Sequence, residues 1–306
     1  MACSVEVHAR YAVFPVCEIR AALFVKRHAR HDGSHVCGSI DMMARSIADD
    51  DGRAARGLPA SISFDKVAAI YDETRGGLER GVRFAAAIAR HCGDGPTFEI
   101  GIGTGAIAIA LRDLIGRPVL GADLSPAMLI HAQARLGATV VEADVECLPV
   151  AAHAVATVIA SWILHLVGDP AATVRECRRV LRPNGRLVVI SSRGELEPDD
   201  IESTQVDLHD AIRGRLDVRQ RLEPIAAAAG FDLVEEFLTD PGTWLESPAD
   251  LVERMVKRQW GVLIELDDER FARIVQPVID GLSALPEPER KRTRVGRHRL
   301  FVFAPR

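Results

Sequence analysis

Hydrophobic positions from Phe64 onward change repeatedly between a helical and a strand period, which predicts alternating helices and strands. Apolar residues recur at helical spacing over 64–71, and a second helical face runs over 78–91. Short β-rich runs then predict strands at 97–100, 119–123, 139–142, 155–162 and 186–192. Helices are expected between these strands, beginning near Gly105, Pro126 and Pro170, because proline suits a first helical turn.

Strands separated by helices of this length indicate parallel βαβ units with helices on both faces. Two helices over 199–213 and 217–229 and two strands over 231–237 and 298–303 complete the predicted fold. The stretch 241–297 between these strands is too long for a hairpin loop, and Ser247-Pro248 and 271–282 read as helical. We therefore predict an α/β protein with a Rossmann-like, seven-stranded, mostly parallel sheet and a helical cap inserted before the last strand.

Residues 1–58 show no clean period, and basic residues outnumber acidic ones over 1–30. We interpret 1–58 as an N-terminal extension; the alternatives are a disordered tail, a start wrongly placed upstream of Met42 or Met43, a functional tail or an organelle-targeting leader. The core domain is predicted over 59–240, the cap over 241–297, and the last strand of the core sheet over 298–306.

The composition favours a cytoplasmic enzyme acting on a small-molecule substrate. The formal charge of −5 supplies no basic surface of the kind that nucleic-acid binders use. No apolar run is long enough to span a bilayer, and residues 1–30 lack the apolar stretch of a signal peptide. The six cysteines form no Cys-x-x-Cys pair, which is typical of reduced thiols. We expect no nucleic-acid or membrane partner and a monomer or homodimer.

The sequence Phe98-Glu99-Ile100-Gly101-Ile102-Gly103-Thr104-Gly105 ends the first predicted strand. Glycines there allow a sharp turn and a close approach of a ligand to the backbone. Asp123 closes the second strand, where a carboxylate can accept both ribose hydroxyls of either a nicotinamide dinucleotide or an adenosyl cofactor. Asp144 follows the third strand and could accept from an adenine amine, which is harder to explain in a nicotinamide enzyme.

With these motifs the sequence resembles the class I S-adenosylmethionine-dependent methyltransferases, in particular the type-11 methyltransferase domain family. The resemblance covers 60–193 and is carried by four stretches in order, namely 64–72, 99–105, 123–129 and 181–187. It departs from the family at Val155-Ala156, where Phe-Asp is common at the start of the fourth strand. The resemblance implies S-adenosyl-L-methionine as the cofactor.

Carried over position by position, the resemblance also implies a cofactor site. Glu99, Gly101, Gly103 and Gly105 would surround the methionine moiety, and Asp123 would take the ribose hydroxyls. The adenine would be flanked by Leu124 and Met128, with Asp144 and Val145 at its edge. Tyr71 and Arg75 would close over the cofactor, with Arg75 near the methionine carboxylate; a solvated surface charge is an equal alternative for Arg75.

Ser161, Trp162 and His165 follow the fourth strand, at the edge where open parallel sheets bind ligands. We predict that Ser161 contacts the cofactor and Trp162 the substrate, although such an aromatic is more often pocket wall or core. His165 is the candidate general base, with an unassigned structural role as the alternative. In the cap, Trp244, Arg258 and Trp260 are expected to anchor its packing, with substrate contact as the alternative. His28, His31, His35 and Cys37 have no partner cluster, so no metal is predicted.

The function predicted from these residues is methyl transfer to a small-molecule acceptor by in-line displacement. Two rival hypotheses remain at this stage. An NAD(P)-dependent Rossmann oxidoreductase shares the strand, the glycine turn and the acid after the second strand. A non-catalytic regulator that binds S-adenosylmethionine could keep the fold without turnover.

Overall fold

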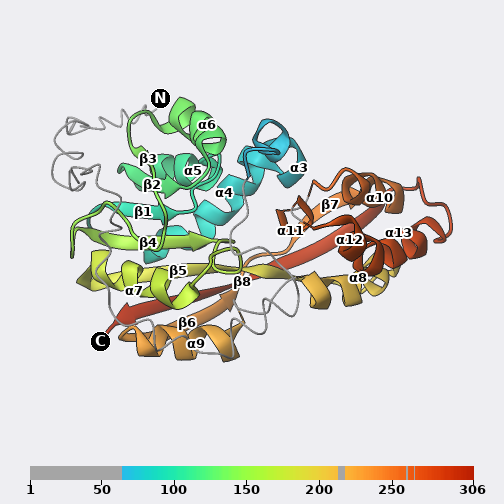
Figure 1. Cartoon of the computed structure of the whole chain (residues 1–306). Coiled ribbons are helices and arrows are strands. Elements are labelled where there is room, and N and C mark those ends of the chain that lie inside the picture. The colour runs from blue at the N-terminus through green and yellow to red at the C-terminus, as the bar shows by residue number, and fades with distance from the viewer. Residues whose placement is uncertain (1–63, 213–217, 260, 265) are drawn as a thin grey trace, which may run out of the picture.

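The computed structural model describes residues 64–212, 218–259, 261–264 and 266–306, so the predicted extension over 1–58 lies outside the described residues. These residues build one sheet with the strand order β3-β2-β1-β4-β5-β8-β6, and β7 pairs with β8 beside this path (Figure 1). The strands are β1 Thr97–Ile100, β2 Val119–Asp123, β3 Val140–Glu142, β4 Val155–Ser161, β5 Leu181–Leu196, β6 Phe231–Leu238, β7 Gly242–Glu246 and β8 Arg292–Pro305.

The five strands from β3 to β5 run parallel, and β8 is antiparallel to β5, β6 and β7. This arrangement confirms the predicted Rossmann-like, mostly parallel sheet. The sheet has one strand more than expected, because β8 begins at Arg292 instead of 298 and its first residues pair with β7. Strand β7 and the first residues of β8 both lie inside 241–297, which was expected to be helical. A five-residue strand is too short for its alternation of buried and exposed positions to stand out in the sequence.

Helices cover both faces of the sheet. They are α3 Tyr71–Arg75, α4 Gly77–Ile88, α5 Ala106–Ile115, α6 Pro126–Leu136, α7 Pro170–Val180, α8 Asp200–Ile212 and α9 Arg219–Ala228. Residues of α4, α5 and α6 pack on one apolar cluster, and residues of α7 and α9 on the other. Side-chain caps begin two of the predicted helices, since Ser125 accepts from the Met128 amide and Asp169 from the Ala172 amide. None of the described helices has the length and apolarity needed to cross a membrane.

The remaining helices form a cap with its own apolar core at one end of β5 and β8 (Figure 1). They are α10 Pro248–Val256, α11 Gly261–Ile264, α12 Asp268–Ile274 and α13 Gln276–Ser283. The stretch expected as one helix over 271–282 is therefore two helices that meet at Val275. Helix α8, which precedes the predicted cap, contributes Ile201 and Leu208 to the same core.

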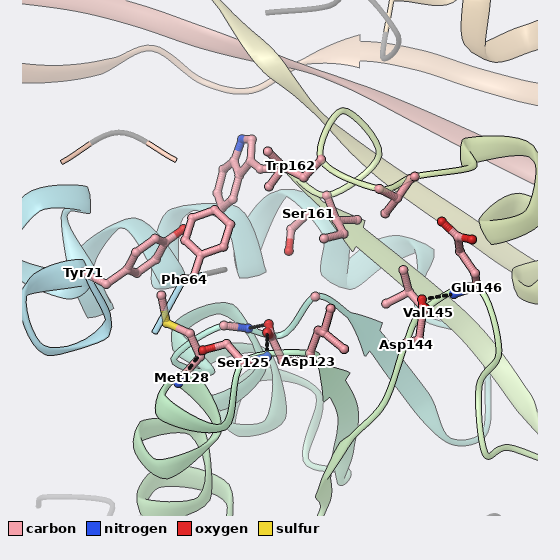
Figure 2. Close-up of a pocket in the computed structure, with 17 residues that line it drawn as sticks. Phe64, Tyr71, Asp123, Ser125, Met128, Asp144, Val145, Glu146, Ser161 and Trp162 are labelled. Atoms are coloured by element: carbon pink, nitrogen blue, oxygen red, sulfur yellow. Dashed lines mark hydrogen bonds between the residues drawn. The ribbon is translucent and has the colours of Figure 1, made fainter. Parts of the chain in front are cut away.

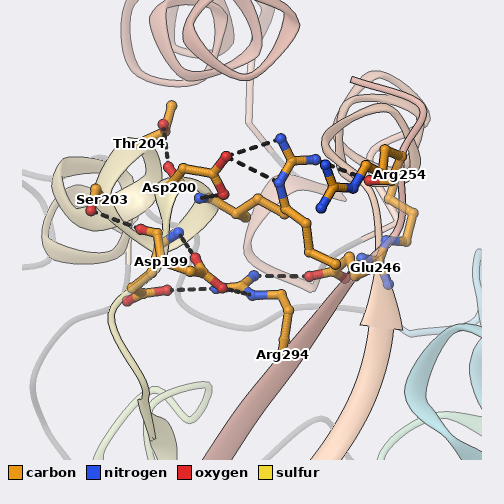
Figure 3. A network of polar contacts seen from close by, with 11 residues as sticks. Asp199, Asp200, Ser203, Thr204, Glu246, Arg254 and Arg294 are labelled. Carbon is orange, nitrogen blue, oxygen red and sulfur yellow. Dashed lines mark hydrogen bonds and ion pairs between the residues drawn. The ribbon is translucent and has the colours of Figure 1, made fainter. Parts of the chain in front are cut away.

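A buried ion-pair network ties the cap to the sheet (Figure 3). Arg294 of β8 is 3% exposed and pairs with Asp199 at 2.9 Å, Glu202 at 3.2 Å and Glu246 at 2.9 Å. Glu246, at the end of β7, also pairs with Arg254 of α10. The network thus joins α8 and β8 to β7 and α10, which lie between them in the sequence.

Candidate active site

Two adjoining cavities lie at the carboxyl ends of β1, β2 and β4. The larger has a volume of about 490 Å³ (Figure 2), and the smaller about 50 Å³. Both are lined by Tyr71, Gly101, Gly103, Ser161 and Trp162. Open parallel sheets bind their ligands at this edge, beyond the carboxyl ends of the strands.

Asp123 is held in place by the turn around it. Its Oδ2 accepts from the Gly103 amide at 2.8 Å, and its Oδ1 accepts from the Ser125 amide at 2.9 Å. Burial raises the pKa of Asp123, and these backbone hydrogen bonds oppose the shift. Each carboxylate oxygen can accept more than one hydrogen bond, so the side chain is oriented and still able to bind two hydroxyls.

The glycine turn brings backbone, rather than side chains, to the cavities. Gly101 and Gly103 have φ of 65° and 56°, and a Cβ on Gly101 would lie 2.8 Å from the Ile163 side chain. Gly105 lines neither cavity, so its place beside the methionine moiety stays a prediction. It precedes α5 with φ 77°, and a Cβ there would meet Leu136 at 3.1 Å, so its small size serves the packing of α5 on α6.

Glu99 is a buried acid with one oxygen left unsatisfied. It is 1% exposed and lines the smaller cavity. Its Oε1 accepts from the Ser161 hydroxyl, whereas Oε2 makes no hydrogen bond within the described residues. Burial raises the pKa of Glu99 to about 8; the Ser161 hydrogen bond opposes this and the nearby Asp123 charge adds to it. A buried acceptor of this kind, at the wall of a cavity, is suited to a ligand that carries a hydrogen-bond donor.

Arg75 faces the same small cavity with a charge of opposite sign. Its Nη2 donates to the Gln259 carbonyl of the cap at 3.1 Å, and it makes no ion pair with the described residues. Burial lowers the pKa of Arg75 because the guanidinium is desolvated. Glu99 and Arg75 together therefore fit a zwitterion, with an ammonium for the acid and a carboxylate for the guanidinium. The methionine end of S-adenosylmethionine carries these two groups.

Residues 64–75, which we term the roof segment, are clamped over the glycine turn by two acids. Asp72 accepts from the Thr104 hydroxyl at 2.6 Å and pairs with Arg135, and Asp65 accepts from the Ser125 hydroxyl at 2.5 Å. Burial raises the pKa of Asp72, but the hydrogen bonds from Arg135 and Thr104 outweigh burial and lower it. Sequence reasoning assigned neither acid a role. No local sequence pattern marks them, because their partners Thr104, Ser125 and Arg135 lie far along the chain.

The larger cavity joins the roof segment to the predicted adenine site (Figure 2). Met128 is buried and packs against Val67 and Ala68 of the roof segment. Val145 is buried, whereas Asp144 is exposed and accepts from the Glu146 amide at 2.9 Å. The cavities thus bring together most of the predicted site residues, namely Tyr71, Arg75, Glu99, Gly101, Gly103, Asp123, Leu124, Met128, Asp144, Val145, Ser161 and Trp162.

Trp162 stands where the two cavities meet. Its φ of 51° is unusual for a bulky residue, and such strain concentrates at functional sites. The indole packs edge-on against Phe84, with ring centres 4.6 Å apart, and the Arg80 guanidinium lies 3.5 Å from the centre of its ring. Arg80, which also lines the smaller cavity, was missed in the sequence because it lies on a helix with no motif of its own.

His165 lines neither cavity, although its neighbours Ile163 and Leu166 line the larger one. Its role as a general base therefore stays a prediction. Arg258 pairs with Asp268 and donates to the Leu266 carbonyl, contacts that lie within the cap.

Trp244, also singled out in the sequence, lines neither of the two cavities. It lies in the middle of β7 and packs beside Gly296 of β8. Trp260 lies outside the described residues, as do His28, His31, His35 and Cys37. Across the described residues no group of three or more His, Cys, Asp or Glu side chains could hold a metal ion.

Comparison with known proteins agrees with this geometry. Residues 98–189 match the family described as "Methyltransferase domain". The ubiquinone/menaquinone biosynthesis C-methyltransferase of Desulfotalea psychrophila is 32% identical over 42% of this chain and 56% of its own length. The malonyl-[acyl-carrier protein] O-methyltransferase of Hahella chejuensis is 32% identical over 41% of this chain and 47% of its own. The chain spans about half the length of the curated relatives it matches.

A solved structure from Bacillus halodurans, assigned to the methyltransferases, shares the fold with a TM-score of 0.50. It is 19% identical and covers 72% of this chain and 97% of that chain. Fold, glycine turn and family match together define a class I methyltransferase domain of Rossmann-like architecture. The family match covers residues 98–189, which hold the glycine turn, Asp123 and Ser161, and the cofactor of such domains is S-adenosylmethionine.

Proposed function

We propose that this protein transfers a methyl group from S-adenosylmethionine to a small-molecule acceptor. One observation carries the proposal: Glu99 Oε2, which finds no hydrogen bond within the described residues, and the Arg75 guanidinium, which forms no ion pair with them, line one small cavity that adjoins Asp123. Glu99 matches the ammonium of the cofactor's amino acid, Arg75 matches its carboxylate, and Asp123 matches the ribose hydroxyls. A nicotinamide dinucleotide has no ammonium to satisfy Glu99, which disfavours the oxidoreductase alternative.

In this proposal the residues bind and orient rather than react. Glu99 would accept from the cofactor's ammonium, Arg75 would bind its carboxylate, and Asp123 would accept from its ribose hydroxyls. The bound cofactor supplies an electrophilic methyl group. The roof segment and Trp162 would exclude water and hold the acceptor in line with the carbon–sulfur bond, which accounts for much of the rate in such displacements.

The acceptor is proposed only as a small molecule. The relatives are named for C-methylation in ubiquinone/menaquinone biosynthesis, O-methylation of malonyl-[acyl-carrier protein] and methylation of arsenite, so the shared domain does not determine the acceptor. The net charge of −5 supports a small molecule over nucleic acid. The predicted adenine contacts, the domain limits, a cytoplasmic location and a monomeric or homodimeric state belong to the same proposal.

The test is turnover of S-adenosylmethionine to S-adenosylhomocysteine with a panel of phenols, carboxylic acids, amines and thiols. We expect turnover with at least one class. Asp123→Asn should reduce kcat/KM about tenfold or more, because a charged acceptor for the ribose is lost. Asp113→Asn, on the exposed face of α5, is the matched control and should leave turnover unchanged. Cofactor binding without turnover on any acceptor would favour the non-catalytic regulator instead.

A further inference from the structure

The roof segment meets the cap through a residue of the predicted cofactor site. Arg75, the last residue of α3, lines the smaller cavity, and its Nη2 donates to the Gln259 carbonyl at 3.1 Å. Gln259 lies between α10 and α11, and its own amide donates to the Arg254 carbonyl of α10 at 2.9 Å. One guanidinium therefore lines the smaller cavity and also binds the chain segment that follows α10.

Helix α11 makes a second contact between the cap and the roof segment. Its Leu263 is buried in the apolar core of the cap, whereas the next residue, Ile264, packs against the cluster of Val67, Ala68 and Met128. Val67 and Ala68 belong to the roof segment. The cap thus contacts the roof segment just before α11, at Gln259, and again at the last residue of α11.

Beside these contacts, the joint between the roof segment and the cap is loosely packed. A cavity of about 390 Å³ is lined by Ile70, Glu73 and Thr74 of the roof segment and by residues of β7 and α10. A region with few buried apolar contacts opens locally at a low cost in free energy. The contacts of Gln259 and Ile264 therefore have a large influence on how firmly the cap lies on the roof segment.

Arg75 carries its charge without an ion pair among the described residues. Burial lowers the pKa of Arg75, the nearby Tyr71 opposes this shift, and the charge of Arg254 adds to it. A neutral carbonyl compensates a buried cation less well than an anion does. The cofactor's carboxylate would supply that anion and hold the guanidinium where Nη2 reaches Gln259. The five N–H donors of a guanidinium allow both contacts at once.

We propose that the cap positions Arg75 through the Gln259 carbonyl, and that cofactor binding in turn holds the cap on the roof segment. This proposal rests on the proposed function, because it takes Arg75 to bind the methionine carboxylate. The coupling is reciprocal, so the factor by which the cofactor favours the closed cap equals the factor by which the closed cap raises cofactor affinity. Leu166 lines the larger cavity and packs against the cap core, so a closed cap would also fix one wall of that cavity.

Amide hydrogen exchange of the full-length protein, with and without saturating S-adenosylhomocysteine, tests this coupling. The reporters are the amides of Lys257, Arg258 and Gln259, which donate to carbonyls of α10. In wild type we expect the ligand to slow their exchange about tenfold. In Arg75→Gln the slowing should disappear, at a ligand concentration that still saturates the variant. Arg75→Lys, which keeps the charge but lacks the forked donors, should also lose most of it.

Glu99→Gln is the matched control, because it weakens the contact with the cofactor's ammonium and leaves Arg75 and Gln259 in place. At saturation this variant should show the same slowing as wild type. The amides of α9, a helix that lines neither the larger nor the smaller cavity, report any general stabilisation of the fold by the ligand.

Two results would overturn the inference. In one, the wild-type protein binds S-adenosylhomocysteine, but the amides of residues 257–259 exchange as fast as before. In the other, the slowing persists in both Arg75 variants, which would show that the cap responds to the cofactor without Arg75. Failure of the wild-type protein to bind S-adenosylhomocysteine at all is a different result, because it contradicts the proposed function itself.

Discussion

Glu99 is the residue at which stability and function conflict most clearly. Its side chain is buried, Ser161 satisfies one oxygen, and the other has no donor within the described residues. Burial raises its pKa to about 8, so the acid is mostly neutral at pH 7 in the absence of a ligand. A buried polar group that is left incomplete is tolerated mainly where a ligand completes it.

This pKa predicts that cofactor binding releases a proton. A bound ammonium favours the carboxylate form of Glu99, so at pH 7 S-adenosylhomocysteine should displace most of one proton. Affinity should then rise close to tenfold per pH unit below pH 7 and level off above about pH 8, where Glu99 is mostly ionised before binding. Calorimetric titration in buffers of different ionisation enthalpy measures the number of protons released on binding.

Glu99→Gln is the control, because the amide cannot ionise. The variant should bind S-adenosylhomocysteine at least about tenfold more weakly than wild type and release no proton from this site. Equal affinity at pH 6 and pH 8 for wild type would show that Glu99 does not meet the ammonium.

Individual elements differ in how far the sequence predicts them. The starts of α5, α6 and α7 agree with the prediction within one residue, because glycine and proline are local signals for a helix start. The polar clamps of the roof segment were not predicted. Asp72 finds its partners Thr104 and Arg135 only after the chain has folded, and no local pattern encodes such a pairing.

The cap depends on Arg294 in the same non-local way, which predicts a large loss of stability on its removal. Arg294→Met would leave Asp199, Glu202 and Glu246 close together in a largely buried site. Breaking a buried pair from one side costs about 3–5 kcal/mol, so urea unfolding should show a loss of that size.

Arg290→Gln is the matched control, since Arg290 and Glu287 form an exposed pair. Loss of this ion pair should change the free energy of unfolding by less than about 1 kcal/mol. A similarly small effect for Arg294→Met would mean that the network contributes little to holding the cap.

At the scale of the whole molecule, the part that carries the proposed cofactor site was predicted better than the cap. Strand, glycine turn and the acid at a strand end follow one another in the chain, so Glu99, Gly101, Gly103 and Asp123 could be placed from sequence. The cap combines α8 with helices α10 to α13, which follow it in the chain only after α9, β6 and β7, and β7 pairs with β8 across most of the insertion 241–297. The hydrophobic periodicity of one segment does not indicate which other segments it packs against.

The central claim is that the two adjoining cavities hold S-adenosylmethionine, and a crystal structure with S-adenosylhomocysteine tests it most directly. The account predicts the ammonium within hydrogen-bond distance of Glu99 Oε2, the carboxylate at Arg75 and the ribose hydroxyls at Asp123. A structure of the complex in which Glu99 Oε2 stays unsatisfied and the ligand lies outside these cavities would contradict it.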